Sequence, residues 1–159
     1  PLLGVGAALV LLAACDGDSD MIGQPEGQPQ AVVSEAEGIR LTLRTDKPEY
    51  DPGEPVVLTF EVENTTNVTQ NFDFSDGCQH DFVVRQDGET VWSASHDRAC
   101  IQSLTSFELE PGEVWSRSDV WDQRSSKGEP VDSGAYDASA TLTQTGKPLD
   151  SDPLRIVIR

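Results

Sequence analysis

From residue 39 onward, apolar and polar residues alternate along the chain with a period of two. This period is typical of β-strands that bury one face, because successive side chains of a strand point to opposite sides. The clearest alternating runs are residues 39–43, 56–62, 72–74, 136–142 and 154–158. No segment spaces its apolar residues as a helix would over three turns. The pattern therefore predicts an all-β domain.

Turn-forming residues separate these runs. The segment KPEYDPGEP lies between the first two runs, and Pro111-Gly112 follows the run that ends at Leu109. Asp87-Gly88 stands between HDFVVRQ and ETVWS and is a strong hairpin signal, because both residues accept a positive φ. About seven to nine short strands at this spacing predict an immunoglobulin-like antiparallel β-sandwich. In such folds Tyr136, near the start of a late strand, is expected to return its hydroxyl to the backbone.

The chain begins with an apolar run from Leu2 to Ala14 that is too short to span a bilayer. Two alanines directly before Cys15 are typical of an export signal, and the LAAC tetrapeptide resembles the lipobox of bacterial lipoproteins. The resemblance implies cleavage before Cys15 and acylation of its sulfur, which anchors a protein to a membrane. We predict a signal peptide at residues 1–14, with its basic n-region truncated. We further predict export and lipid anchoring on the periplasmic or cell-surface side of the envelope.

Residues 15–37 are polar and rich in Gly, Pro and Gln, a composition that buries little apolar area. We predict that they form a flexible linker that follows the lipidated Cys15. The β-domain is then expected to occupy residues 38–159. This division leaves one domain of ordinary size.

The charge balance narrows the range of partners. The chain carries 28 acidic and 11 basic residues, for a formal net charge of −17. A nucleic-acid binder needs a basic patch, so this composition argues against nucleic acid as a partner. We expect a monomer that binds another protein.

Two cysteines follow the predicted signal, Cys78 and Cys100, and in an oxidising compartment they most simply form a disulfide. The alternative is a metal site in which His80 and His96 join them as ligands, in the pattern C-x-H and H-x3-C. A two-residue hairpin turn would place Gln79 opposite His96 and gather these side chains at the open end of the hairpin. We predict the disulfide, with neither a metal nor a cofactor.

Two His-Asp dipeptides, at residues 80–81 and 96–97, accompany many serines and raise the question of a hydrolase. Hydrolysis needs a base held against a nucleophile by a third group, and the chain has no G-x-S-x-G turn. We predict that these dipeptides are solvated loop residues and that the protein is not an enzyme. Three aromatic residues are expected to pack in the core, not to line a ligand surface: Trp92, Trp115 and Trp121.

Short motifs follow one another in a defined order between about residues 57 and 142. The first is a strand that ends in Asn. A hairpin follows, with Asp-Phe-x-Val in its first strand, an Asp-Gly turn and Val-Trp in its second strand. Next come a Leu-x-Pro-Gly-Glu turn, a strand that ends in Trp and a strand that begins with Gly-x-Tyr. Their positions are Asn64, Asp81, Phe82, Val84, Asp87, Gly88, Val91, Trp92, Leu109, Pro111, Gly112, Glu113, Trp121, Gly134 and Tyr136. This order resembles the BsuPI domain family, named for an intracellular proteinase inhibitor. The resemblance implies a β-sandwich that inhibits a proteinase.

We therefore predict a lipid-anchored, protein-binding β-sandwich of the cell envelope, with proteinase inhibition as the activity that the resemblance implies. Two alternatives stay open: a structural or assembly lipoprotein without inhibitory activity, and a metal-binding envelope protein. The candidate binding segment is the loop from Ser93 to Ser103, where His96, Asp97 and Arg98 precede the second cysteine. Arg98 would offer a basic side chain to a trypsin-like proteinase, and an adjacent disulfide would lower the ordering cost of binding. The plainer interpretation is a connecting loop.

Overall fold

Strands make up the regular structure of the chain in a computed structural model, which describes residues 28–96 and 98–159. The strands among these residues are β1 (Gln30–Ala36), β2 (Ile39–Thr45), β3 (Glu49–Tyr50), β4 (Val56–Asn64), β5 (Gln70–Phe74), β6 (His80–Gln86), β7 (Glu89–Ser93), β8 (Thr105–Leu109), β9 (Val114–Trp121), β10 (Gly134–Leu142), β11 (Leu149–Asp150) and β12 (Leu154–Ile158). The predicted all-β class is confirmed. Within the described part of the chain, the structure contains no helix with the length and apolar character of a membrane span.

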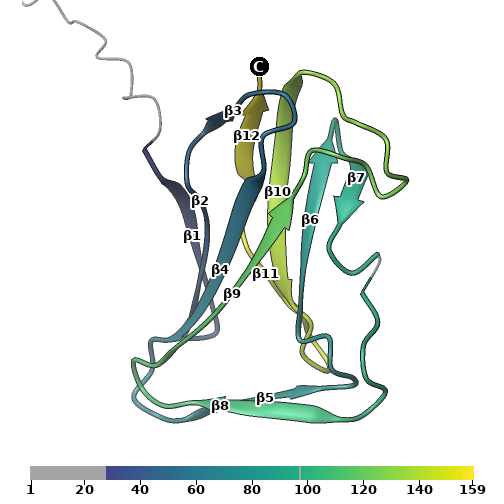
Figure 1. Ribbon diagram of the computed structural model, residues 1–159. Helices are drawn as coiled ribbons and strands as arrows, with labels where there is room; N and C mark the ends of the chain where they lie inside the picture. Colours follow the sequence, from purple (N-terminus) through teal and green to yellow (C-terminus); the bar gives the residue numbers. More distant parts are fainter. Residues whose placement is uncertain (1–27, 97) are drawn as a thin grey trace, which may run out of the picture.

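Two sheets pack face to face and form a β-sandwich (Figure 1). One sheet has the order β1-β2-β4-β9, and the other has the order β3-β12-β10-β6-β7, with β11 paired to β10. Neighbouring strands are antiparallel except for β12 and β3, which run parallel. A separate pair, β5 and β8, lies across one end of the sandwich, at the bottom of Figure 1. We call this the lower end, and we call the opposite end, where β4 and β10 begin, the upper end.

The core is built from every second residue of the long strands, as the alternation predicts. In β4 the buried positions alternate with less buried ones from Val56 to Asn64, and β10 repeats this pattern from Tyr136 to Leu142. Phe60 of one sheet meets Phe82 of the other edge to face, with ring centroids 6.4 Å apart. Burial of apolar area on this scale is the main term that stabilises such a domain.

Aromatic side chains close the lower end. Phe107 of β8 stacks on Trp115 of β9 with ring centroids 5.3 Å apart. Phe72 and Phe74 of β5 are buried and contact the ring of Phe107. The β5–β8 pair is therefore fixed to the body of the sandwich. The core packing predicted for the tryptophans is confirmed: Trp115 and Trp121 are buried and Trp92 packs against the core.

The predicted linker is wrong in its last part, because residues 30–36 form β1. Glu37 and Gly38 adopt positive φ values of 55° and 80° and turn the chain back into β2. Val32 and Ala36 pack against the core, which gives this short strand enough apolar contact to pair. Together with the two-residue strands β3 and β11, it raises the strand count above the seven to nine expected. Residues 15–27 of the predicted linker, and the predicted signal and lipidation site, lie outside the described residues.

The Asp87-Gly88 hairpin forms as predicted, with positive φ values of 50° and 85°. A β-bulge then shifts the register of β6 and β7, so that Val84 pairs with Trp92. The bulge lets Val91 and Trp92 both pack against the core, although consecutive strand residues normally point to opposite faces. The predicted opposition of residues 79 and 96 is therefore wrong, since the ladder is out of that register and ends at Ser93.

Loops at the upper end are tied to the core by buried polar side chains. The amide of Gln123 accepts from Gly53 N at 2.7 Å and donates to the carbonyl oxygens of Asp51 and Glu54 at 2.8 and 2.7 Å. The Tyr136 hydroxyl donates to the Asp132 carbonyl at 2.7 Å, as predicted for a tyrosine near the start of a late strand.

At the lower end, the side chain of Asn64 ties loops to the core in the same way. Its amide donates to the carbonyl oxygens of Val68 and Leu109 at 2.7 and 2.9 Å, and its side-chain oxygen accepts from Thr66 N at 3.0 Å. The side chain is fully buried. Asn64 thereby joins the β4–β5 turn to the end of β8.

Candidate functional site

The segment between β7 and β8 leaves the edge of the larger sheet and descends to the lower end of the sandwich (Figure 1). A disulfide between Cys78 and Cys100 joins it to the short connection between β5 and β6. The two Cα atoms are 5.4 Å apart, and the bridge closes a separation of 22 residues. The predicted disulfide is confirmed.

Three further contacts hold this segment on both sides of its exposed part. Gly77 N donates to the Ile101 carbonyl at 2.9 Å, and Thr105 Oγ1 donates to the Asp76 carbonyl at 2.7 Å. Thr105 also pairs with Phe74 at the start of the β5–β8 ladder. We call residues 100–104 the tethered loop, because both of its ends are bound to residues 74–78.

The segment that contacts the tethered loop, residues 76–78, has a local structure that allows the contact. The Asp76 carboxylate accepts from Cys78 N at 2.8 Å and closes a turn of the Asx type. Gly77 fits beneath Ile101 because it has no side chain: a Cβ there would lie 2.5 Å from Ile101 Cγ1. A side chain at this position would therefore require the Ile101 side chain to move.

The tethered loop displays two large apolar side chains. Ile101 is 66% exposed and Leu104 is 84% exposed, and the polar residues Gln102 and Ser103 between them are exposed as well. Single exposed apolar residues are common on protein surfaces. Here two of them lie within four residues on a loop that is covalently and hydrogen-bonded to the body. This arrangement fits a contact surface for another protein.

Arg98, the basic residue of the predicted binding loop, does not offer its side chain to a partner as the sequence analysis expected. Arg98 Nη2 forms an ion pair with Asp119 Oδ2 at 2.5 Å, and Nη1 donates to the His80 carbonyl at 3.2 Å. The guanidinium is therefore turned onto the body and does not project as a bait. His96 N donates to the Ser93 carbonyl at 3.2 Å, and Asp97 lies outside the described residues.

The acidic residue of the first His-Asp dipeptide has a structural role. The Asp81 carboxylate accepts from Ser93 Oγ at 3.0 Å and from Ser95 Oγ at 2.7 Å, and it also accepts from Ser95 N at 2.9 Å. These contacts hold the chain where it leaves β7. The hydroxyls of Ser93 and Ser95 thus donate to the Asp81 carboxylate, and these hydrogen bonds stabilise the turn.

His80 lies between aromatic rings at the lower end. Its ring centroid is 5.5 Å from that of Phe82 and 5.6 Å from that of Trp115. Burial, together with the positive charges of Arg98 and Arg117, lowers the pKa of His80 to about 4. The ring is therefore neutral near pH 7 and packs as an aromatic residue.

The alternative metal site needs Cys78 and Cys100 as free thiolates. In the structure these two cysteines form a disulfide with each other. Asp76, Cys78 and Cys100 present ligand atoms within 4.8 Å of one another, but the disulfide removes both sulfurs as thiolate ligands. His80 is packed against Phe82 and Trp115. The arrangement with Cys78, His80, His96 and Cys100 as a four-ligand set is therefore wrong for the disulfide-bonded protein.

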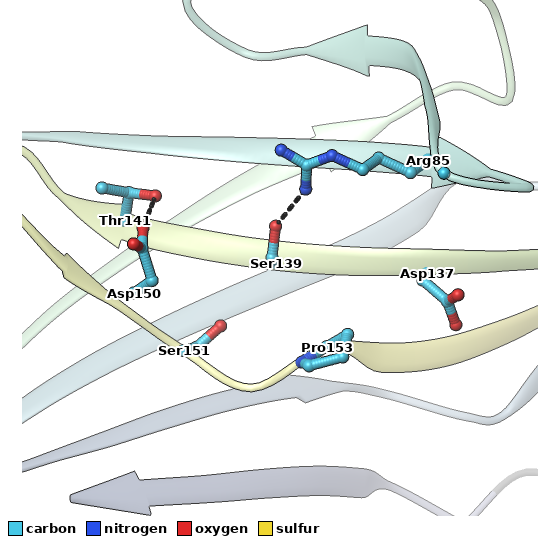
Figure 2. A pocket seen from close by; sticks show the side chains of 8 residues that line it. Arg85, Asp137, Ser139, Thr141, Asp150, Ser151 and Pro153 are labelled. Carbon is cyan, nitrogen blue, oxygen red and sulfur yellow. Dashed lines mark hydrogen bonds between the residues drawn. The ribbon is translucent and has the colours of Figure 1, made fainter.

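A shallow recess on the outer face of the larger sheet is lined mostly by polar residues (Figure 2). Arg85 Nη1 donates to Ser139 Oγ at 2.9 Å, and Thr141 Oγ1 donates to Asp150 Oδ1 at 2.5 Å. These side chains satisfy one another across neighbouring strands. The recess therefore offers a weaker case for binding than the tethered loop.

Comparison with known proteins identifies the family. A profile of the BsuPI family, described as intracellular proteinase inhibitors, matches residues 43–147, well over half of the chain. The chain belongs to the BsuPI family. The match covers the tethered loop and the strands on either side of it. No curated protein sequence matches the chain.

Several solved structures are similar to parts of this chain at low sequence identity. The sporulation control protein Spo0M from Bacillus subtilis is 20% identical, with a TM-score of 0.47 over 78% of this chain and 50% of its own. An alkylpurine DNA glycosylase from Pseudomonas fluorescens is 16% identical, with a TM-score of 0.46 over 77% of this chain and 30% of its own. A β-glucosidase from Erythrobacter marinus is 16% identical, with a TM-score of 0.41 over 84% of this chain and 15% of its own. The chain thus spans half or less of each of these proteins, and we draw no function from them.

Most residues on which the family resemblance rests serve the fold. Asn64 joins two turns, and Tyr136 closes the corner before β10. Glu113 closes the Pro111-Gly112 turn, where its carboxylate accepts from Glu110 N at 2.8 Å. Trp121 Nε1 donates to the Arg124 carbonyl at 2.9 Å.

The predicted binding segment, Ser93 to Ser103, contains Ile101 but stops before Leu104, and its candidate residues were His96, Asp97 and Arg98. The two exposed apolar residues of the tethered loop were therefore not identified from the sequence. Cys100, at the start of the tethered loop, was the feature of the sequence that could have pointed to this loop. A disulfide beside a short run that belongs to no strand marks a rigid connection. The exposure of Leu104 could not be inferred from its residue type.

Proposed function

We propose that this protein is a non-enzymatic proteinase inhibitor that contacts its target through the tethered loop. Membership of the BsuPI family supports inhibition as the activity. The observation that carries the assignment to this loop is the combination of exposed apolar side chains with anchors at both ends of the segment.

A tethered segment suits inhibition for a physical reason. A flexible loop loses conformational entropy when a proteinase holds it, at a cost of about 0.5–1.5 kcal/mol for each immobilised side chain. The disulfide and the contacts of Gly77 and Thr105 have already removed part of that freedom in the unbound protein. Binding energy from Ile101 and Leu104 is then retained as affinity.

We also propose that the inhibitor works outside the cytoplasm, anchored by lipid on Cys15. The LAAC tetrapeptide at the end of the apolar run supports this placement. The disulfide agrees with it, since such bonds persist mainly in oxidising compartments. Mass spectrometry of the native polypeptide should find acyl chains on residue 15. An unmodified Cys15 thiol would contradict the lipid anchor and leave the inhibitor assignment standing.

Inhibition is tested by titration of the full chain against endoproteinases of different specificity. We expect residual activity to fall to a plateau at a stoichiometric ratio, with the inhibitor still intact by mass spectrometry. Linear loss of the chain by digestion, with no decrease in proteinase activity, would refute inhibition. That result would favour the alternative of a structural envelope protein.

A further inference from the structure

The tethered loop also indicates which side chain enters a proteinase, an inference that rests on the proposed function. We propose that Leu104 is the specificity-determining residue, and that the partner is an endoproteinase whose primary specificity pocket is apolar. Arg98, the basic residue shortly before Cys100 in the sequence, does not have this role.

The first support is the difference in exposure within the loop. Leu104 is 84% exposed, whereas Ile101 is 66% exposed and packs over Gly77. Leucine branches at Cγ, and its side chain extends from the backbone more freely than that of a β-branched isoleucine. Leu104 therefore has the greater reach into a pocket, and Ile101 is placed as a secondary contact.

The second support is the backbone on either side of Leu104. Its neighbour Thr105 is held by the hydrogen bond to the Asp76 carbonyl and by its pairing with Phe74. On the other side, the Ile101 carbonyl accepts from Gly77 N next to the disulfide. Leu104 thus stands near the end of a short span with two fixed ends, where its backbone is held in place before a partner binds.

The third support is electrostatic. A basic side chain can enter an acid-lined pocket only if its charge is free, and Arg98 holds both the Asp119 carboxylate and the His80 carbonyl. Moving this guanidinium into a proteinase would leave Asp119 without that ion pair. The protein's net charge of −17 adds repulsion toward a negatively charged pocket.

The test measures inhibition constants of the full chain against chymotrypsin and subtilisin, which accept apolar side chains, and against trypsin, which accepts basic ones. The variants are L104A, L104R and R98A. Val68→Ala is the matched control, because Val68 is 56% exposed and lies in the connection between β4 and β5, outside the tethered loop. Circular dichroism and thiol titration verify that each variant is folded and disulfide-bonded.

We expect the unmodified chain to inhibit chymotrypsin or subtilisin, and L104A to weaken that inhibition about thirtyfold, as for a buried contact residue. L104R should shift inhibition toward trypsin, while R98A and V68A remain within about threefold of the unmodified chain.

Each contrary outcome has a distinct meaning. Inhibition of trypsin that R98A abolishes would overturn the assignment to Leu104 and leave the proposed function intact. Inhibition of chymotrypsin or subtilisin that L104A does not change would also overturn it. Absence of inhibition toward all three proteinases, with the variants equally inactive, would instead count against the proposed function itself.

Discussion

Loops are fixed to the body at both ends of the sandwich, but the fixing side chains are buried at the upper end, whereas the lower end holds an apolar side chain in solvent. At the upper end, Gln123 ties three backbone groups together, and Trp121 packs on Tyr136 with ring centroids 5.3 Å apart. At the lower end, a disulfide fixes a loop whose apolar side chain, Leu104, stays in solvent. Ordering a loop and burying it are therefore separate properties. The upper end serves stability, and the tethered loop displays a surface.

The largest effect on folding should follow from truncation at the upper end. Trp121→Ala removes a fully buried ring and the hydrogen bond to the Arg124 carbonyl. We expect the free energy of unfolding to fall by about 3–5 kcal/mol, as for other large-to-alanine core substitutions. Urea unfolding measures this loss. A change below about 1 kcal/mol would mean that the upper end is less closely packed than the structure indicates.

Removal of the disulfide should have the next largest effect and should act at the lower end. With Cys78 and Cys100 both replaced by alanine, we expect a loss of about 3 kcal/mol, because the bridge closes a separation of 22 residues. Unlike Trp121→Ala, this double variant should also weaken proteinase inhibition under conditions where it is fully folded. Unchanged inhibition by the folded double variant would show that the anchors at Gly77 and Thr105 are sufficient.

Acidification should destabilise the lower end through His80. Its pKa is about 4 in the folded protein and near 6.5 when unfolded, so the unfolded chain binds more protons between these values. Stability should therefore fall as the pH is lowered from about 6.5 to 4. Discounted for partial exposure, the loss is about 1–2 kcal/mol. Denaturant unfolding of the unmodified chain and of His80→Gln measures it, since the variant should lack this part of the pH dependence. Equal pH profiles would contradict the burial of the ring.

The smallest change in stability should come from the tethered loop itself. Leu104→Ala removes a side chain that is 84% exposed, so we expect the free energy of unfolding to change by less than about 0.5 kcal/mol. Thermal unfolding beside the Val68→Ala control is sufficient to detect a larger change. A loss of 2 kcal/mol or more would show that Leu104 is buried in solution, and the contrast between the two ends would fail.

The strands could be predicted because a half-buried strand imposes its period of two directly on the sequence. The hairpin at Asp87-Gly88 and the corner at Tyr136 were predictable for a related reason, since each depends on local chemistry. β1 was missed because its alternation is weak: Val32 packs inward, but the adjacent Val33 is exposed. The bulge in β6–β7 depends on packing against the core, which local sequence does not specify.

The site was only partly predictable, because exposure is a property of the whole fold. Leu104 and Leu109 lie five residues apart and share a residue type, yet one is 84% exposed and the other 2%. The ion-pair partner of Arg98 could likewise not be predicted from the neighbouring sequence, since Asp119 is 21 residues farther along the chain. The two cysteines could be paired because two thiols in an oxidising compartment leave few choices.

A proteinase that binds this protein should contact the tethered loop. Amide hydrogen exchange of the full chain, alone and in complex with a catalytically inactivated subtilisin or chymotrypsin, tests it most directly. We expect slowed exchange at residues 100–105 and in the facing segment 74–78, with exchange around Gln123 unchanged. Protection confined to the upper end, or a complex that leaves residues 100–105 unprotected, would contradict it.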